Sequence, residues 1–299
     1  MKLGIHLPLM EFGSEGLSLS RLTDAVDAAV ECDLDALSAN DHFVFSTPWL
    51  DGLTALAAVL ERSGRMTLAT TISLSALRGP VALAKSLAAL DLLSDGRLIA
   101  GVGPGSSQRD YDAMGLPFEE RWKRFEESVV RLRALLRGTD GQLEPRPAGD
   151  VPIWIGSWGS DAGLSRVARL ADGWLASAYN TTPEQFAAAR ESLRAKLVER
   201  GRDAEGFPNA LVTMWTWVTE DRAEAERVLG DVLAPLLRRD PDDLRDHLCI
   251  GSAEHCAEIL SGYARAGSQW VQLWPLGDER RQIECVAANV IPRIEGRAS

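Results

Sequence analysis

Short apolar runs typical of β-strands alternate with longer amphipathic segments along this chain, and the step between successive runs is nearly constant. The first four runs begin at residues 3, 36, 66 and 97, a spacing that indicates repeated units of one strand and one helix. Several runs are apolar throughout, as strands buried on both faces of a parallel sheet are. The predicted strands cover residues 3–8, 36–40, 66–73, 97–102, 151–155, 173–178, 211–219 and 269–274.

Eight strand–helix pairs favour a closed (β/α)₈ TIM barrel of the α/β class over an open doubly wound sheet. No G-x-G-x-x-G follows the first strand, as a dinucleotide-binding sheet would require. Helix starts support the pattern, because Thr182 and Gln185 are expected to form a capping box, Asp221 to open a further helix in the same way, and Ser252 and Asp278 to cap the last two helices. The length of 299 residues suits one barrel, so we expect a single domain over residues 1–299.

The charge balance excludes several classes of partner. The chain has 32 Lys and Arg against 43 Asp and Glu, a formal charge of −11, and it lacks the basic cluster that nucleic acids or anionic membranes require. The longest uncharged stretch, residues 206–219, is shorter than the roughly 18 residues of a membrane span. The amino terminus also lacks the apolar region of a signal peptide. We therefore expect a cytoplasmic protein that binds neither nucleic acid nor membrane.

Cysteine and histidine usage argues against a metal site. No C-x-x-C or H-E-x-x-H occurs among four cysteines and four histidines. We expect no metal ion, and we expect the cysteines to be buried, reduced thiols. These are Cys32, Cys249, Cys256 and Cys285.

The carboxyl ends of barrel strands form the active site in this architecture, and His42 follows the second strand there. Its imidazole can exchange a proton near neutral pH. Asp41 precedes it and is expected to orient the ring and fix its tautomer. The alternative is a structural histidine held by backbone. His6, inside the first strand, is expected to line the barrel.

Two glycine-containing loops follow later strands. Gly103 and Gly105 allow a planar or phosphorylated ligand to approach the backbone after the fourth strand, or they form only a tight turn. The run Gly156-Ser157-Trp158-Gly159-Ser160 precedes a helix, where exposed N–H groups and hydroxyls make an anion site. The alternative there is simple capping by Ser160 or Asp161.

Nine tryptophans are present, and four of them fall at or beyond predicted strand ends, where they line an aromatic cleft or pack in the core. No nucleophile elbow or spaced carboxylate pair accompanies them. The pattern indicates a cavity for a bound organic cofactor. The four are Trp49, Trp158, Trp217 and Trp274.

Taken together, the motifs resemble the bacterial-luciferase-like superfamily of flavin- and deazaflavin-dependent oxidoreductases. The resemblance spans nearly the whole chain, and the combination is specific although each piece alone is weak. The matching stretches are residues 68–80, 84–97, 101–105, 115–121, 171–174, 250–254 and 266–267, together with Asp41-His42 and Trp274-Pro275.

The resemblance implies a barrel that binds reduced FMN or the 5-deazaflavin coenzyme F420. It places a non-proline cis peptide at Thr71–Ile72, behind the isoalloxazine ring, and brings His42 near the reactive part of the ring. Further cofactor contacts are implied by position in the family pattern. These are Gly103 and Gly105 beside the cofactor, Ser157, Trp158 and Gly159 at the phosphate, and Ser177 as an additional hydroxyl donor.

One departure from the family pattern narrows the range of expected activities. Sugar-phosphate and alcohol dehydrogenases of the deazaflavin branch carry a Glu directly after the G-x-G turn as a proton donor, whereas this chain has Ser106. That argues against those two activities and leaves the proton donor unassigned.

The sequence therefore predicts an oxidoreductase or monooxygenase that acts on a small organic substrate. Its expected partners are a separate flavin or deazaflavin reductase and a second copy in a homodimer. The alternatives are a flavin-binding barrel without turnover and a flavin-free phosphate-binding barrel of the aldolase or isomerase type. An aldolase is the weakest of these, since no predicted strand contains an internal Lys.

Overall fold

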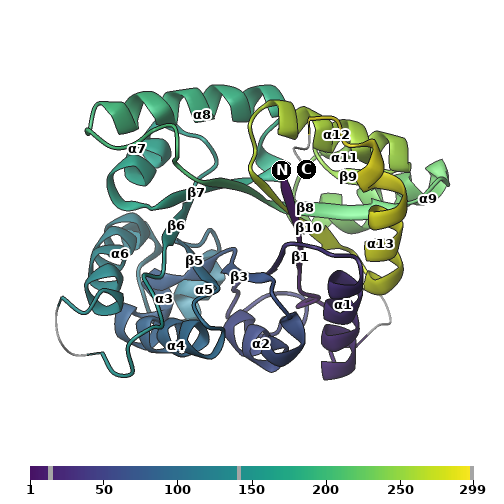
Figure 1. Cartoon of the computed structure of the whole chain (residues 1–299). Coiled ribbons are helices and arrows are strands. Elements are labelled where there is room, and N and C mark those ends of the chain that lie inside the picture. The colour runs from purple at the N-terminus through teal and green to yellow at the C-terminus, as the bar shows by residue number, and fades with distance from the viewer. Residues whose placement is uncertain (13–15, 140–142, 297–299) are drawn as a thin grey trace.

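The computed structural model describes residues 1–12, 16–139 and 143–296, and it shows a closed barrel of parallel strands surrounded by helices (Figure 1). β10 pairs with both β1 and β8, which closes the sheet on itself. The predicted (β/α)₈ fold is confirmed, and each of the eight predicted strands overlaps a barrel strand. Those strands are β1 (Lys2–His6), β2 (Ala36–Ala39), β3 (Thr67–Thr70), β5 (Leu98–Gly103), β6 (Ile153–Gly156), β7 (Gly173–Ser177), β8 (Asn209–Val218) and β10 (Trp270–Pro275).

Helices cover the outside of the barrel, and most begin where the sequence signals them. Thr182 and Gln185 form the predicted capping box, and the side chains of Asp221 and Ser252 cap their helices. The described helices are α1 (Leu19–Glu31), α2 (Gly52–Ala58), α3 (Ser75–Arg78), α4 (Pro80–Leu93), α5 (Gln108–Ala113), α6 (Arg121–Leu136), α7 (Asp161–Leu170), α8 (Pro183–Val198), α9 (Arg222–Arg227), α10 (Ala234–Leu237), α11 (Pro241–Arg245), α12 (Ala253–Arg265) and α13 (Glu279–Cys285).

The prediction that Asp278 caps the last helix is wrong. Asp278 precedes α13, but its backbone is left-handed at φ 41°, and its side chain makes no capping hydrogen bond. Its carboxylate instead lies 3.5 Å from Arg281, one turn into the helix. A cap side chain needs an extended backbone to reach back to the helix N–H groups, so the residue type alone misled the prediction.

Two short strands were not predicted. β4 (Ser73–Leu74) pairs with β5, so the predicted strand 66–73 is interrupted at residues 71 and 72. β9 (Cys249–Gly251) pairs with β8 outside the barrel and follows an excursion that contains α9, α10 and α11. Runs of two or three residues are too short to show a period, which is why the sequence does not reveal them.

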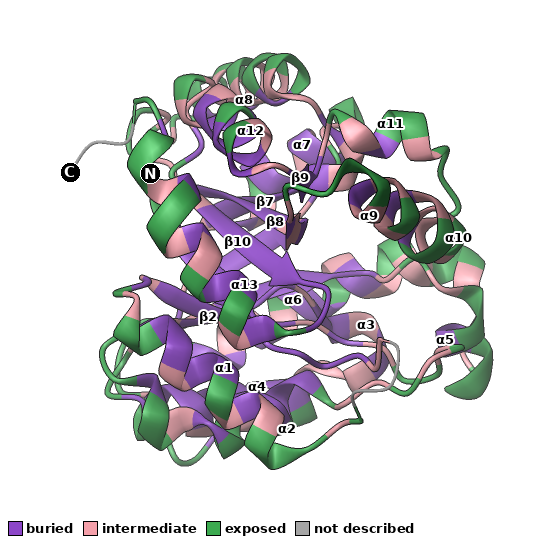
Figure 2. Cartoon of the chain, turned by 90° about the vertical axis from the view of Figure 1, so that its right-hand side faces the viewer, coloured by how far each residue is buried: buried purple, intermediate pink, exposed green. Residues whose placement is uncertain are grey.

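The barrel interior is a packed core, as expected for eight strands. Trp154, Leu175, Ala210 and Val212 form a buried cluster inside it, and most residues of the strands are buried (Figure 2). His6 lies in the barrel wall as predicted, with 3% of its surface exposed.

The cysteine prediction is half right. All four thiols are free, but Cys32 and Cys285 are partly exposed, and only Cys249 and Cys256 are buried. Cys32 follows α1, and Cys285 ends α13. In the described part of the chain, no helix has the length and apolar character needed to cross a bilayer.

Close strand packing leaves no room for a side chain at Gly101 of β5. A Cβ there would lie 1.9 Å from the Thr70 carbonyl oxygen and 2.6 Å from Leu175 Cδ1. Backbone cannot yield as a side chain does, so we expect Gly101→Ala to lower the free energy of unfolding by at least the ~1–3 kcal/mol of overpacking. Gly230→Ala is the control, since nothing lies within 4 Å of its Cβ position. Denaturant unfolding of both variants checks this, and a wild-type midpoint for Gly101→Ala would contradict it.

Candidate functional site

The carboxyl ends of the strands bring the predicted site residues to one face of the barrel. At its centre, the Thr71–Ile72 peptide is cis, as predicted. The Ile72 side chain lies over β5 and β6: a Cβ at Gly103 would be 2.0 Å from Ile72 Cδ1, and one at Gly156 would be 3.3 Å from Cγ2. Glycine at these two positions therefore makes the room in which Ile72 sits.

The Ile72 segment is fixed on both sides by backbone hydrogen bonds. Asp41 N–H donates to the Ile72 carbonyl at 3.1 Å, and Thr71 N–H donates to Ala39 at 2.7 Å. Thr71 Oγ1 is buried and has no hydrogen-bond partner. An unpartnered buried hydroxyl is costly, which makes this oxygen a candidate ligand contact.

Gly105 completes the turn after β5. Its φ of +82° favours glycine, and a Cβ there would be 3.0 Å from Leu74. Tyr111 Oη donates to the carbonyl of Pro104 at 2.5 Å, so the turn is held rigidly. Gly103 contacts the Ile72 side chain, whereas Gly105 packs beside Leu74 and Tyr111.

The imidazole of His42 is oriented by Asp110, not by Asp41 as predicted. His42 Nδ1 lies 2.8 Å from Asp110 Oδ2, and the other carboxylate oxygen accepts from the N–H groups of Phe43 and Val44 at 2.9 and 2.7 Å. Burial would raise the pKa of Asp110, but the hydrogen bonds from His42 and these amides lower it on balance. The ionised carboxylate accepts the Nδ1 proton, which leaves Nε2 of His42 for a ligand.

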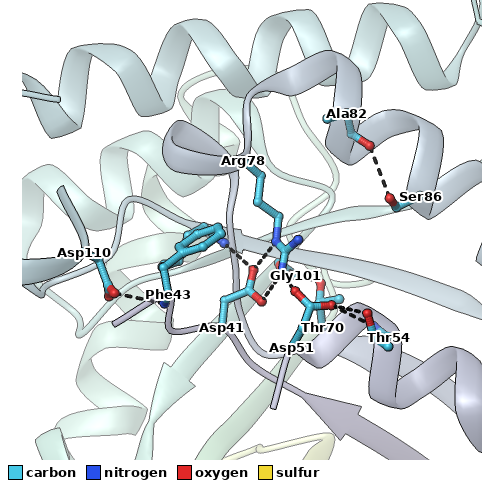
Figure 3. A network of polar contacts seen from close by, with 11 residues as sticks. Asp41, Phe43, Asp51, Thr54, Thr70, Arg78, Ala82, Ser86, Gly101 and Asp110 are labelled. Atoms are coloured by element: carbon cyan, nitrogen blue, oxygen red, sulfur yellow. Dashed lines mark hydrogen bonds and ion pairs between the residues drawn. The ribbon is translucent and has the colours of Figure 1, made fainter. Parts of the chain in front are cut away.

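Asp41 has a different role, which corrects the prediction. It forms a bidentate ion pair with Arg78 at 2.6 Å for each contact and accepts from Leu74 N–H at 3.1 Å. Arg78 also contacts the carboxylate of Asp51, so its guanidinium lies between two acids (Figure 3). Burial would lower the pKa of Arg78, and the two carboxylates raise it on balance. This pairing occupies both carboxylate oxygens of Asp41.

Trp158, Gly159 and Ser160 line a cavity of about 380 Å³ next to α7 and α8, whereas Ser157 of the predicted phosphate loop is not among its lining residues. Ser157 is buried, and its Oγ accepts from Gly159 N–H at 3.3 Å, while Ser160 caps α7 through Gly163 N–H at 3.2 Å. The predicted cap by Ser160 is therefore confirmed, and the anion loop stays a prediction. Trp158 is 57% exposed at the rim.

Ser177 also lines this cavity. Its Oγ accepts from Asn180 Nδ2 at 3.0 Å and lies 2.9 Å from Thr213 Oγ1. Thr213 donates its own proton to the Val212 carbonyl at 2.6 Å, so Ser177 is the donor in their contact. Its hydroxyl proton is committed unless that bond breaks.

Aromatic rings form the other side of the site. His6, Trp274 and Trp215 stack in that order, with centroids 3.6 and 3.8 Å apart. Trp49 meets both Trp274 and His42 edge-on, whereas Trp217 contributes no ring contact of this kind in the described structure. Burial lowers the pKa of His6 to about 3, against the opposing hydrogen bond to Leu7. Neutral His6 donates from Nδ1 to Leu7 at 2.7 Å, leaving Nε2 as a buried acceptor without a partner.

The family model for luciferase-like monooxygenases matches residues 1–239. The chain belongs to this family. A 5,10-methylenetetrahydromethanopterin reductase from Methanolobus tindarius is 29% identical over 214 residues, which cover 68% of this chain and 62% of that protein. The chain spans between about half and two thirds of the length of the curated relatives that it matches.

Solved structures share the fold over nearly their whole length. An F420-dependent secondary alcohol dehydrogenase with an F420-acetone adduct has a TM-score of 0.83 at 19% identity, covering 98% of this chain and 99% of that one. The FMN complex of the oxygenating constituent of 3,6-diketocamphane monooxygenase from Pseudomonas putida has a TM-score of 0.73 at 17% identity, with the same coverage. Both solved structures therefore have the same barrel fold as this chain.

Asp110 and Asn180 are site residues that sequence reasoning missed. Asp110 follows Ser107 by three positions, and this S-x-x-D spacing marks a helix start; Ser107 Oγ does accept from Asp110 N–H at 3.3 Å. That signal predicts a cap and says nothing of His42, 68 positions away. No sequence pattern singles out Asn180. Within the described residues, no cluster of three or more His, Cys, Asp or Glu is arranged to hold a metal ion.

The Asp110 pair gives a pH-dependent stability. Because the folded pKa is lowered, its contribution is present above the unfolded value of ~3.9 and is lost as the pH falls through the folded value. Hydrogen bonds to a charged group contribute ~1.5–3 kcal/mol, so Asp110→Asn should lower the melting temperature at pH 7, and the deficit should shrink only as the pH falls below the unfolded value and through the lowered folded pKa. Asp112→Asn, an exposed change in the same helix, is the control. A deficit independent of pH would contradict the ionic role.

Proposed function

We propose that this chain is an oxidoreductase that works with a reduced, phosphorylated flavin or deazaflavin. The observation that carries the proposal is the position of Ile72. Its carbonyl accepts from the residue before His42, and its side chain contacts Gly156, the residue before the phosphate loop. An apolar platform thus lies between a proton-exchanging imidazole and an anion pocket. That order matches a cofactor with a planar ring at one end and a phosphate at the other.

The residues present fit such a group. Gly103 and Gly156 admit Ile72 beneath a ring, the Thr71 hydroxyl is buried without a partner, and the Ser157 loop offers N–H and hydroxyl donors at the start of α7. When bound, a reduced deazaflavin supplies a hydride, and a reduced flavin can also react with oxygen. Thr71, Ile72, Gly103, Ser157 and Gly159 are the residues proposed to hold it.

His42 is proposed to hold or move a proton at Nε2. Asp110 fixes the Nδ1 tautomer at 2.8 Å, so neutral His42 presents an acceptor and protonated His42 presents a donor. His42 is thus the proposed proton donor, because this chain has Ser106 where the related dehydrogenases carry a Glu. The substrate is a small organic molecule, and the deazaflavin is favoured over FMN by the Asp41-His42 motif. The alternative function, a barrel that binds a flavin without turnover, predicts the same cofactor binding and gives His42 no catalytic role.

Cofactor titration tests the phosphate placement. We expect purified wild type to bind FMN or F420 with a dissociation constant below about 1 mM, which corresponds to a binding free energy of roughly −4 kcal/mol. Gly159→Asp should weaken that binding at least tenfold, because a carboxylate then faces an anion. Absorbance and fluorescence quenching give the affinities, and circular dichroism checks the fold, since Gly159 has φ +89°. Gly159→Asn is the neutral control at the same strained position. Equal affinities for the Asp and Asn variants would refute the placement.

Substitution of His42 separates proton exchange from ring orientation. General acid–base help contributes ~10²–10⁴ in rate, so His42→Ala should lower turnover at least tenfold with any active substrate or artificial acceptor. His42→Asn can still donate to Asp110 from its amide but lacks Nε2, and we expect it to keep the melting temperature while turnover falls as in His42→Ala. Retention of turnover by His42→Asn would show that His42 is only structural.

A further inference from the structure

His6, at the end of β1, has a buried nitrogen atom that needs a hydrogen-bond donor. Its Nδ1 donates to the Leu7 carbonyl at 2.7 Å, and only 3% of the residue is exposed. Because burial lowers the pKa of the imidazole to about 3, the ring is neutral at pH 7, and its Nε2 has a lone pair but no proton. Among the described residues nothing donates to this lone pair, although an unpaired buried acceptor is costly.

Asn40 brings a second unpaired acceptor to the same place. β1 and β2 are neighbours in the barrel with His6 opposite Ser38, and Asn40 comes directly after β2, two positions beyond Ser38. Its side chain is within hydrogen-bonding reach of the His6 ring, and its Oδ1 is buried without a partner in the described structure. An amide oxygen and an unprotonated imidazole nitrogen are both acceptors, so neither satisfies the other.

A half-turn of the Asn40 amide removes both mismatches at once. The oxygen and nitrogen of an amide are nearly equal in size, so exchanging them leaves the packing unchanged. Nδ2 then donates to His6 Nε2, and Oδ1 takes the other end of the amide. Asn40 is half-buried, and it lies at the mouth of the barrel, the face formed by the carboxyl ends of the strands. The accessible end of its amide is then a hydrogen-bond acceptor.

An aromatic stack holds the imidazole that imposes this orientation. Trp274 lies against the His6 ring at a centroid distance of 3.6 Å, and Trp215 lies against Trp274 at 3.8 Å. Trp215 follows a bulge at Thr213, where β8 has one more residue than β10 between paired positions. The backbone of this β-branched residue is left-handed at φ 59°, a strained conformation of the kind that re-aims side chains next to sites. The stack thus keeps the His6 ring from tilting toward another partner.

We propose that Asn40 contacts the substrate and determines specificity, and that His6 is the positioning residue that fixes the Asn40 amide with Oδ1 toward the mouth. This inference rests on the proposed function. Asn40 lies two positions before His42, whose Nε2 is the proposed proton-exchanging atom. A substrate that meets both side chains has one group that exchanges a proton with His42 and a separate O–H or N–H that donates to Asn40.

The substrate class selected in this way is an uncharged molecule with a hydroxyl or N–H donor beside its reacting group. Asn40 and neutral His6 provide no counter-charge, so an ion at this position would lose its hydration without compensation. A plain aldehyde or ketone of the same shape would leave Oδ1 of Asn40 without a donor. Sites built to hydrogen-bond a hydroxyl or N–H reject analogues that lack it, because the polar group of the protein is then left unpaired.

The positioning role of His6 is tested by ¹⁵N NMR of histidine-labelled protein without a ligand. The chain has four histidines, so a His6→Phe variant assigns the His6 signals. We expect the Nδ1-protonated tautomer in wild type, with the Nε2 resonance moved upfield by the hydrogen bond from Asn40. Asn40→Leu should move Nε2 downfield, whereas Asn289→Leu, the same change at an exposed asparagine, should not. An Nε2 resonance that ignores Asn40→Leu would overturn the inference.

Selectivity for a donor is tested with two probes that differ only in that donor, 2-naphthol and its methyl ether. Calorimetric titration gives their affinities for wild type and each variant. One neutral hydrogen bond contributes up to about tenfold in affinity, so wild type and Asn289→Leu should bind 2-naphthol about tenfold more tightly than the ether. Asn40→Leu and His6→Phe should bind both probes alike. His6→Gln can still accept from Asn40 and should keep part of the preference.

Melting temperatures show which variants are folded, and Asn40→Leu decides the question if His6→Phe does not fold. Both measurements are made without a cofactor. A protein that binds neither FMN nor F420 would therefore defeat the proposed function, while the NMR and probe titrations still decide whether His6 orients Asn40 to accept from a ligand. Equal affinities of wild type for the two probes, no binding of 2-naphthol, or an undiminished preference in folded Asn40→Leu would overturn the inference.

Discussion

The buried carboxylate of Asp41 is the interaction on which the mouth of the barrel depends. Its oxygens hold Arg78 and Leu74 N–H, and its own N–H holds the Ile72 carbonyl. One residue thereby fixes the segment between β3 and β4 against the end of β2. Removing one partner of a buried ion pair leaves the other uncompensated, so the position of Ile72 and the charge balance of this pair are coupled.

Two consequences follow for the neighbouring side chains. With Asp41 occupied by Arg78, the imidazole of His42 needs another acceptor, and Asp110 of α5 provides it. The same carboxylate binds the amides of Phe43 and Val44, so the loop after β2 is fastened to the loop after β5. The proton-exchanging group and the platform are thus held by separate carboxylates, and each can be altered with limited effect on the other.

The sequence was sufficient for the barrel and insufficient for the pairings within the site. Strand period and family pattern located the eight barrel strands, the Thr71–Ile72 peptide and the glycines around Ile72, because each depends on local sequence. The partner of His42 was assigned to Asp41, its neighbour in the chain, whereas the structure uses Asp110. The hydrogen-bonded residues Asn180 and Arg239 are 59 positions apart and lie in no motif. Contacts of this kind depend on how loops return to the mouth, and a period cannot predict them.

Closure of the sheet also determines how the protein can meet other chains. In the described structure, β10 bonds to both β1 and β8, so the barrel strands form a continuous ring, and the strands that pair on one side only are β4 and β9, of two and three residues. An open edge of that length is too short to template an added strand. Contacts between copies of the folded barrel therefore use helix and loop surfaces, because the barrel strands offer no free edge to which a strand of another copy could be added.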